Sequence, residues 1–497
     1  MKLFTAAALA AAALSPASAQ PQPATAPAPV ASPQDWRATA VRDVLAAYDI
    51  YAENHPGMHD RGNPAFAAQL KRARDEAMAV AEKAMTRDDY SRALALFTAG
   101  LSDGHAVVYA KSPPATAPAT LEWPGFIAAW RGDHMVVTQA EEGASALAGA
   151  AIVSCDGRPV RDVVLERMRT RGLRPNEAGH WWARAAQAFT SSAASRARRP
   201  ERCDFRTPQG LLTMPLSWAP APADLSAKLR RASDGEKTPI GLSEPRPGLF
   251  LVGLPDFQPD EAGVKAYRAL FATLRERAAD LRRARAVVLD LRYNNGGSSY
   301  WSKETAKALW GDALVERTMD DYFRNVSIWW RASRGNTDYI ADMEAQMRRN
   351  GDTKGAEDIR KVGEGMKASL ARGDFYFVER DEEAPKQGGK PAASAFRTPV
   401  YVITPGGCAS ACLDAIDVFK RFANVKLIGA PTSADSTYMD VRVTDLPSGE
   451  GRIVIPNKMW VGRPRKSGEV YRPDILVADA DWSTAVFLDR IERDLKR

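Results

Sequence analysis

Ser410 stands in a segment whose residues could carry out nucleophilic chemistry. Residues 400–419, VYVITPGGCASACLDAIDVF, predict an apolar strand, a glycine turn and a helix, with Ser410 in the first turn of that helix. Unpaired backbone N–H groups and the positive end of the helix dipole stabilise negative charge at such a position. Serine is also a favoured helix N-cap, so this residue alone is equally open to a structural explanation.

A second segment, residues 287–297, predicts a buried strand that runs into a polar turn. Its sequence, VVLDLRYNNGG, ends in Gly296 and Gly297. Glycines allow backbone conformations that other residues resist, and they let N–H groups approach a ligand closely. Most turns of this kind only connect two elements, so the segment is weak evidence by itself.

Taken together, the two segments resemble the central motifs of the C-terminal processing (tail-specific) and tricorn-type serine peptidases. The resemblance lies in the pattern Asp-Leu-Arg-x-Asn-x-Gly-Gly, followed by a strand, a turn, Ser-Ala and a helix. It implies that Ser410 is the nucleophile. It also implies an oxyanion hole formed by the backbone amide of Ala411 and that of Gly296 or Gly297, which acyl transfer requires.

The base that activates the serine departs from the branch of this family that uses a Ser-Lys pair. Residues 429–435, GAPTSAD, have Asp435 where that branch carries its lysine. The tricorn and retinoid-binding-protein branch has an Asp-x-His motif ahead of the core, and Asp103, Gly104 and His105 resemble it. We therefore expect His105 to act as general base and then general acid, because neutral imidazole can do both near neutral pH.

The other histidines have no comparable context, and we expect them to be surface or structural residues. They are His55, His59, His134 and His180. The first two stand four residues apart, but no further ligand pattern accompanies them, and we expect neither a metal nor an organic cofactor.

The resemblance also implies a glutamate that orients the base. Glu469 lies 59 residues after Ser410, near the distance found in tricorn-type enzymes, and Glu450 is its competitor. A third reading, an exposed glutamate without a role, stays open. Gly104 stands where tricorn has a serine, so the polar relay of that enzyme is not fully reproduced.

The first nineteen residues predict a cleavable secretory signal. They combine Lys2, an apolar run and a small-residue triplet that ends at Ala19, so the mature chain is expected to begin at Gln20. Residues 20–33 are rich in Pro and Ala and predict a linker. The apolar run is too short for a stable membrane span, which predicts a periplasmic or secreted protein.

Four cysteines remain for that oxidising environment: Cys155, Cys203, Cys408 and Cys412. Pairing of Cys155 with Cys203 is the first to test. Buried free thiols are the alternative, and the pairing stays open at this point.

The sequence predicts a multidomain α+β protein. Residues 34–118 form a helical region that ends in the His105 segment, and residues 119–222 read as a β-rich domain. In residues 235–497 strands and helices alternate, which predicts an α/β core, the ββα-superhelix type of the peptidase family. Residues 311–396 interrupt this core as a charged, largely helical insertion, either a lid or a decoration.

Residues 146–160, ALAGAAIVSCDGRPV, resemble the PDZ pattern of a buried strand, an Asp-Gly turn and a second short strand. A PDZ-like domain would bind an extended peptide by strand addition and capture its C-terminal carboxylate. The expected partner is therefore a polypeptide substrate, held by its C-terminal end.

The composition of the chain argues against one class of function. The 68 basic and 61 acidic residues are scattered along the chain, which argues against a nucleic-acid-binding protein. We expect an exported serine endopeptidase that cleaves extended or poorly folded polypeptides. The alternatives are a catalytically decayed binding protein of the same fold and a hydrolase of a non-peptide ester or amide. The sequence leaves the oligomeric state open.

Overall fold

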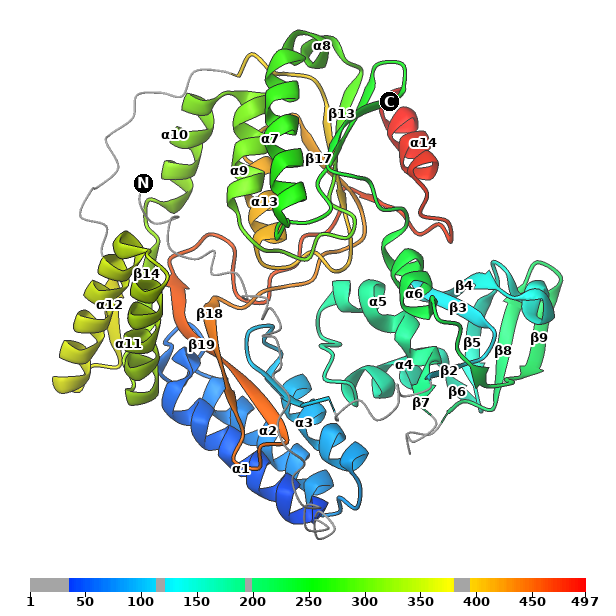
Figure 1. Cartoon of the computed structure of the whole chain (residues 1–497). Helices are drawn as coiled ribbons and strands as arrows, with labels where there is room; N and C mark the ends of the chain where they lie inside the picture. The colour runs from blue at the N-terminus through cyan, green and yellow to red at the C-terminus, as the bar shows by residue number, and fades with distance from the viewer. Residues whose placement is uncertain (1–34, 113–120, 193–198, 380–393) are drawn as a thin grey trace, which may run out of the picture.

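The computed structural model describes residues 35–112, 121–192, 199–379 and 394–497, so the predicted signal and linker lie outside the described residues. A six-stranded sheet forms the centre of the C-terminal half (Figure 1). Its strands, in spatial order, are β11 (Gly241–Arg246), β12 (Leu249–Gly253), β13 (Ala286–Asp290), β16 (Val400–Thr404), β17 (Val425–Gly429) and β20 (Ile475–Leu476). All neighbouring pairs are parallel except β11 with β12.

The central strands of this sheet, β12, β13 and β16, are buried along their whole length and mostly apolar because both faces of the sheet are covered there. Leu251 and Val288 face one hydrophobic core, whereas Val252 and Leu289 face another. The helices of the core region are α7 (Glu261–Glu276), α8 (Ala278–Arg283), α9 (Tyr300–Trp310), α10 (Asp312–Phe323), α13 (Ala411–Phe419) and α14 (Thr484–Asp494). Helices α7, α9 and α13 cover one face, and α14 lies on the other (Figure 1).

A second sheet joins parts of the chain that are far apart in sequence. Its central strand, β19 (Gly451–Val461), pairs with three others: β1 (Val107–Ala110), β14 (Ser327–Arg331) and β18 (Tyr438–Asp445). A fifth strand, β15 (Tyr376–Glu379), pairs with β14. The N-terminal region, the insertion and the core therefore share one sheet.

The insertion is largely helical but also contributes strands to the second sheet. It contains the predicted helices as α11 (Arg334–Arg349) and α12 (Thr353–Ala371), but also the strands β14 and β15. Strand β14 pairs with β19, and β15 pairs with β14. The sequence of the insertion does not identify β19 as a partner. The insertion is thus attached to the core by a sheet.

The N-terminal region is helical, as expected. It consists of α1 (Trp36–Asn54), the short 3-10 helix η1 (Pro56–His59), α2 (Phe66–Ala81) and α3 (Arg87–Leu101). Asp35 caps α1 and Thr86 caps α3, each through a side-chain oxygen that accepts a backbone N–H. The buried faces of the three long helices pack on the second sheet.

Residues 121–234 contain a third sheet. Its strands are β3 (Phe126–Arg131), β4 (His134–Ala140), β5 (Ala151–Cys155), β6 (Arg158–Pro159), β8 (Arg202–Thr207) and β9 (Gly210–Pro215). The helices of this region are η2 (Glu142–Leu147), α4 (Val160–Arg169), α5 (Ala178–Arg184), η3 (Ala185–Phe189) and α6 (Leu225–Asp234). Three very short strands, β2 (Leu121–Trp123), β7 (Ser191–Ser192) and β10 (Ala219–Pro220), form a small separate sheet.

A disulfide between Cys155 and Cys203 joins β5 to β8, which confirms the pairing that the sequence put first.

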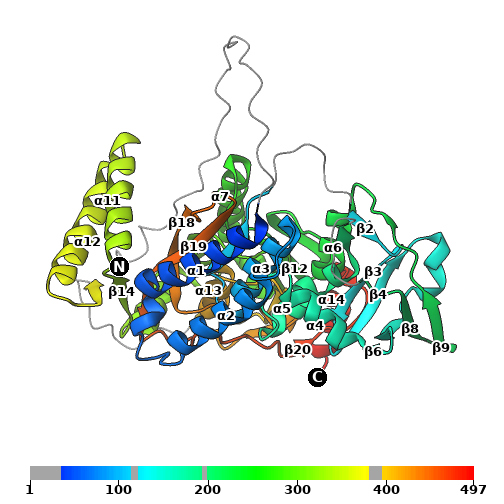
Figure 2. The same ribbon diagram turned by 90° about the horizontal axis from the view of Figure 1, so that it is seen from below.

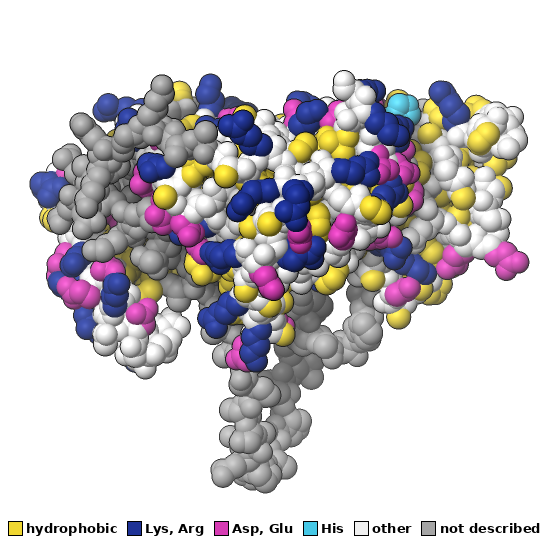
Figure 3. All heavy atoms as spheres, turned by 90° about the horizontal axis from the view of Figure 1, so that it is seen from above, with side chains coloured by type: hydrophobic (Ala, Val, Ile, Leu, Met, Phe, Trp, Pro, Cys, Tyr) yellow, Lys and Arg dark blue, Asp and Glu magenta, His cyan; other side chains and the backbone are white. Residues whose placement is uncertain are grey.

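The third sheet and the pair α11–α12 lie at opposite ends of the molecule (Figures 1 and 2). Lys and Arg side chains are interspersed with Asp and Glu on the face drawn in Figure 3. Among the described residues, no helix is both long and apolar enough to cross a membrane.

Candidate active site

Ser410 lies at the junction of a buried strand and a helix, as the sequence predicts. The strand β16 ends at Thr404, and α13 begins at Ala411, so Ser410 is the residue directly before the helix. Its side chain makes no capping hydrogen bond, although the position is an N-cap. The structural explanation for a serine here therefore lacks its usual bond.

The backbone of Ser410 is in a conformation that favours glycine. Its φ is 54° and its ψ is −127°. Such a conformation costs a residue with a side chain about 1–3 kcal/mol and is found mainly at functional sites. The half-buried Ser410 thus lies at a strained turn, and contacts in the surrounding structure must offset the cost of that strain.

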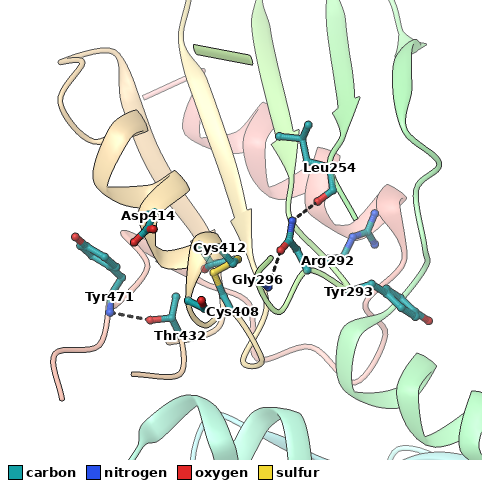
Figure 4. The surroundings of a disulfide bond; sticks show 12 residues. Leu254, Arg292, Tyr293, Gly296, Cys408, Cys412, Asp414, Thr432 and Tyr471 are labelled. Atoms are coloured by element: carbon teal, nitrogen blue, oxygen red, sulfur yellow. Dashed lines mark hydrogen bonds between the residues drawn. A yellow bond between two sulfur atoms is a disulfide. The ribbon is translucent and has the colours of Figure 1, made fainter. Parts of the chain in front are cut away.

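A second disulfide, between Cys408 and Cys412, brackets this serine (Figure 4). Cys408 stands two residues before Ser410 and Cys412 two residues after it, and both sulfur-bearing side chains are fully buried. The N–H of Cys412 also donates to the carbonyl of Ala409 at 3.0 Å. The crosslink ties the turn that precedes the nucleophile to the helix that follows it.

The turn at Gly296 packs directly against the nucleophile. A β carbon at position 296 would lie 2.9 Å from Cβ of Ser410 and 2.8 Å from the carbonyl oxygen of Ala409. The N–H of Gly296 donates to Oδ1 of Asn294 at 3.0 Å (Figure 4), and the N–H of Ala411 has no acceptor within its own helix. The Gly296 turn and the start of α13 thus lie together, and because the N–H of Gly296 already binds Asn294, the choice between Gly296 and Gly297 stays a prediction.

The Asp-Leu-Arg portion of the motif has a structural role. Arg292 is fully buried, and its Nη2 lies 2.7 Å from Oδ2 of Asp290. The Arg292 Nη1 donates to the carbonyl of Trp482 at 2.9 Å. Leaving either charge unpaired in the core would be costly, so the pair fixes the direction in which the turn leaves β13.

His105 follows the end of α3 in a short turn that leads into β1. Its backbone N–H donates to Oδ1 of Asp103 at 2.9 Å, and its Nδ1 atom is buried without a hydrogen-bond partner among the described residues. Asp103 is itself buried and lies 3.2 Å from Nε2 of His55. Because Nδ1 of His55 accepts the N–H of Gly57, its Nε2 carries the proton and donates to Asp103.

Sequence reasoning missed the loop that joins these two parts, residues 432–436. Oδ2 of Asp435 accepts the N–H of Ser410 at 2.6 Å. The hydroxyl of Ser436 donates at 2.7 Å to Oδ1 of Asp103, the oxygen that also holds the His105 backbone. The only signal in the sequence was an acidic residue at the position of the family's lysine.

Helix α5 holds the same loop from the other side. The carboxylate of Glu177 accepts the hydroxyl of Ser433 at 2.6 Å and the N–H of Ala434 at 3.1 Å. The N–H of Gly179 donates to the carbonyl of Thr432 at 3.1 Å. The third-sheet region thus contacts the loop beside the candidate nucleophile.

The two glutamates considered as orienting groups lie apart from these contacts. The exposed Glu469 accepts the N–H of Lys466 at 2.9 Å through its carboxylate. Glu450 forms an ion pair with Arg87 of α3. Among the described residues, neither glutamate forms a hydrogen bond or an ion pair with His105. The role of Glu469 stays a prediction.

The fold and the site together define an α/β hydrolytic core with a serine at a helix start. Residues 251–475 match the model of peptidase family S41, and this part of the chain belongs to that family. The protein is therefore a serine-type peptidase. A comparison of the sequence with curated proteins finds no match.

Two solved structures share most of this fold. Mature CPAF in complex with lactacystin is 14% identical, with a TM-score of 0.61 over 92% of this chain and 98% of CPAF. A second structure, a crystal structure of mature CPAF, gives the same identity and TM-score over 92% of this chain and 97% of CPAF. At this identity the likeness concerns the fold, which extends beyond the core to the N-terminal and third-sheet regions.

Proposed function

We propose that this protein is an exported serine endopeptidase that cleaves extended or poorly folded polypeptides. Ser410 would form the acyl-enzyme, and His105 would serve as its base. The observation that carries the proposal is the strained backbone conformation of Ser410 at the start of α13. The side chain of Ser410 makes no capping hydrogen bond, and the residue packs against Gly296. The family match of the surrounding core supports the same reaction.

In the proposed acylation step, Oγ of Ser410 attacks the carbonyl carbon of a peptide bond and gives its proton to the imidazole of His105. The oxyanion that forms is stabilised by the backbone amide of Ala411 and that of Gly296 or Gly297. The C–N bond then breaks, and the imidazolium returns the proton to the leaving amine. Water, deprotonated by the same imidazole, hydrolyses the ester in the second half of the reaction.

A fluorophosphonate probe tests the nucleophile directly. We expect the purified protein to be labelled and to cleave casein, and we expect Ser410→Ala to do neither. Lactacystin, the compound present in the CPAF complex, can be tested as a competitor of labelling. Absence of labelling would favour a binding protein that has lost catalysis, and cleavage of a short-chain ester without casein would favour a non-peptide substrate.

The base can be tested by combining variants. His105→Ala should lower kcat by several orders of magnitude, comparable with the loss in Ser410→Ala, because nucleophile and base act as one unit. The double variant should then be no slower than either single variant. Losses that multiply would mean that the two residues act independently and that His105 is not the base.

Export is proposed from residues 1–19 alone. N-terminal sequencing of protein recovered outside the cytoplasm should begin at Gln20, and a chain that still begins at Met1 would contradict export by cleavage of this segment.

Capture of a substrate C-terminus by the PDZ-like region is the remaining part of the proposal. In the described residues η3 packs against β3, one edge strand of the third sheet. The opposite edge strand, β9, exposes Leu211. Peptides with free and amidated C-termini should differ in KM if a terminal carboxylate is recognised, and equal KM values would exclude this mode.

A further inference from the structure

The carboxylate of Asp435 is one of the groups closest to the nucleophile, although the family pattern gives it no role. Its Oδ2 accepts the N–H of Ser410 at 2.6 Å, and its residue is only 8% exposed. A buried carboxylate is costly unless it is hydrogen-bonded or paired, so its place beside a reacting group requires an explanation. The backbone bond to Ser410 satisfies one of its two oxygens.

The loop that carries Asp435 is tied to the segment of His105. Oδ1 of Asp103 accepts both the N–H of His105 and the hydroxyl of Ser436, the residue after Asp435. The Nδ1 atom of His105 is buried and has no partner among the described residues. An imidazole that takes up a proton in such a place needs a nearby negative charge.

Several charged or titratable groups surround this pair. Asp103 and His55 lie on the N-terminal side, and the guanidinium of Arg174 packs over Gly104. Nη1 of Arg465 lies 3.8 Å from Oδ2 of Asp435, and its positive charge attenuates the negative charge of the carboxylate. Burial raises the pKa of Asp435, and the positive charges of His105 and Arg465 counteract only part of that rise. The negative charge of Asp414 has the opposite effect to these positive charges and also raises the pKa of Asp435.

Glu469, to which the family pattern assigns the same task, is exposed and accepts the N–H of Lys466. Water screens a charge in that position, whereas Asp435 acts from inside the protein.

We infer that Asp435, rather than Glu469, is the carboxylate on the nucleophile side that, together with Asp103, stabilises the imidazolium form of His105. The inference rests on the proposed function. When Ser410 gives its proton to His105, a positive charge forms on the imidazole. The carboxylate of Asp435 stays ionised and stabilises that charge. One carboxylate then holds the Ser410 backbone and favours the protonated base.

The test compares pH profiles of kcat/KM for wild type, Asp435→Asn and Glu469→Gln. Asparagine keeps an oxygen that can accept the Ser410 N–H but removes the charge. An imidazolium without its negative neighbour is less favoured, so the acid limb of Asp435→Asn should move to lower pH by at least about half a unit. Its kcat should fall about tenfold or more, and the acid limb of Glu469→Gln should stay in place.

Two further variants guard against a purely structural effect. Asp435→Glu keeps the charge, and its acid limb should stay near that of wild type even if kcat falls. Asp435→Ser is a second neutral variant, for use if the asparagine variant does not fold by thermal melting, and it should show the same shift.

An acid limb that does not move in a folded neutral variant would overturn the inference, and so would a shift in Glu469→Gln in its place. Either result would leave the labelling of Ser410 untouched. A wild-type protein that is not labelled would instead contradict the proposed function itself.

Discussion

Gly296 is packed against Ser410 so closely that its missing side chain is part of the site. A β carbon there would lie 2.9 Å from Cβ of Ser410 and 2.8 Å from the carbonyl of Ala409, and the φ of Gly296 is 117°. We therefore expect Gly296→Ala to displace the nucleophile turn. If one oxyanion-hole donor is lost as a result, kcat should fall about 10²–10³-fold, as measured by peptide hydrolysis.

Gly373 provides the matched control for that variant. Its φ is 78°, but a β carbon there would meet no atom within 4 Å. Gly373→Ala should lose about 1–2 kcal/mol of unfolding free energy through backbone strain and keep its kcat. Equal loss of kcat in both variants would mean that strain, and not contact with the nucleophile, explains the effect.

The conformation of Ser410 leads to a second prediction. Relief of its strained backbone, worth about 1–3 kcal/mol, outweighs the extra chain entropy of glycine, about 0.5–1 kcal/mol. Ser410→Gly should therefore be inactive yet about 1 kcal/mol more stable in urea unfolding. Ser410→Ala should be inactive with little gain in stability, and a less stable glycine variant would contradict the strain argument.

The pH dependence of turnover follows from the state of the groups near the base. Burial opposes the charge of Asp103, but the hydrogen bond from His55 and the nearby charge of His105 lower the net pKa of Asp103. Asp103 therefore stays ionised while the imidazole of the base takes up its proton. Imidazolium cannot accept the serine proton, so kcat/KM should show an acid limb when it is measured from pH 5 to 9 in one buffer mixture. An acid limb centred at a clearly higher pH would indicate a lysine base instead.

The disulfide around the nucleophile should serve catalysis more than stability. The Cys408–Cys412 crosslink closes a very short loop, worth about 2 kcal/mol in the chain-entropy account. Because it joins the two sides of the Ser410 turn, Cys408→Ala with Cys412→Ala should lower kcat about tenfold or more while KM changes little.

The crosslink between Cys155 and Cys203 is the control, since it closes a loop with a sequence separation of 48 residues in the third-sheet region. Its removal should cost about 4 kcal/mol of stability and leave kcat of the folded protein unchanged. The reverse pattern in the two double variants would refute a positioning role for the pair at Ser410.

Much of the core could be predicted from local patterns. The strand, turn and helix around Ser410 follow from an apolar run, two glycines and a helical period, and the structure has them within a few residues. The strained conformation of Ser410 could not be predicted, because a serine carries no local signal for it. The fold imposes it through contacts with Gly296 and the nearby crosslink.

The features that escaped prediction depend on residues far apart in the chain. The strand β14 pairs with β19 across more than a hundred intervening residues, and its five residues carry no signal for that distant partner. Asp435 was visible only as a departure from a lysine pattern. Its bond to Ser410 depends on the loop that Glu177 and Asp103 hold in place.

The pairing of β1 with β19 has a consequence for when the protein can become active. Val107 and Val108, just after His105, pair with Val454 and Ile453, so the base is anchored by a strand that is synthesised much later than His105. A nascent chain already carries His105, and later Ser410, but it has no partner strand with which to hold the base in place. Contacts so distant in sequence also form late and slowly. The order of elements along the chain thus delays assembly of the site until β19 has been synthesised.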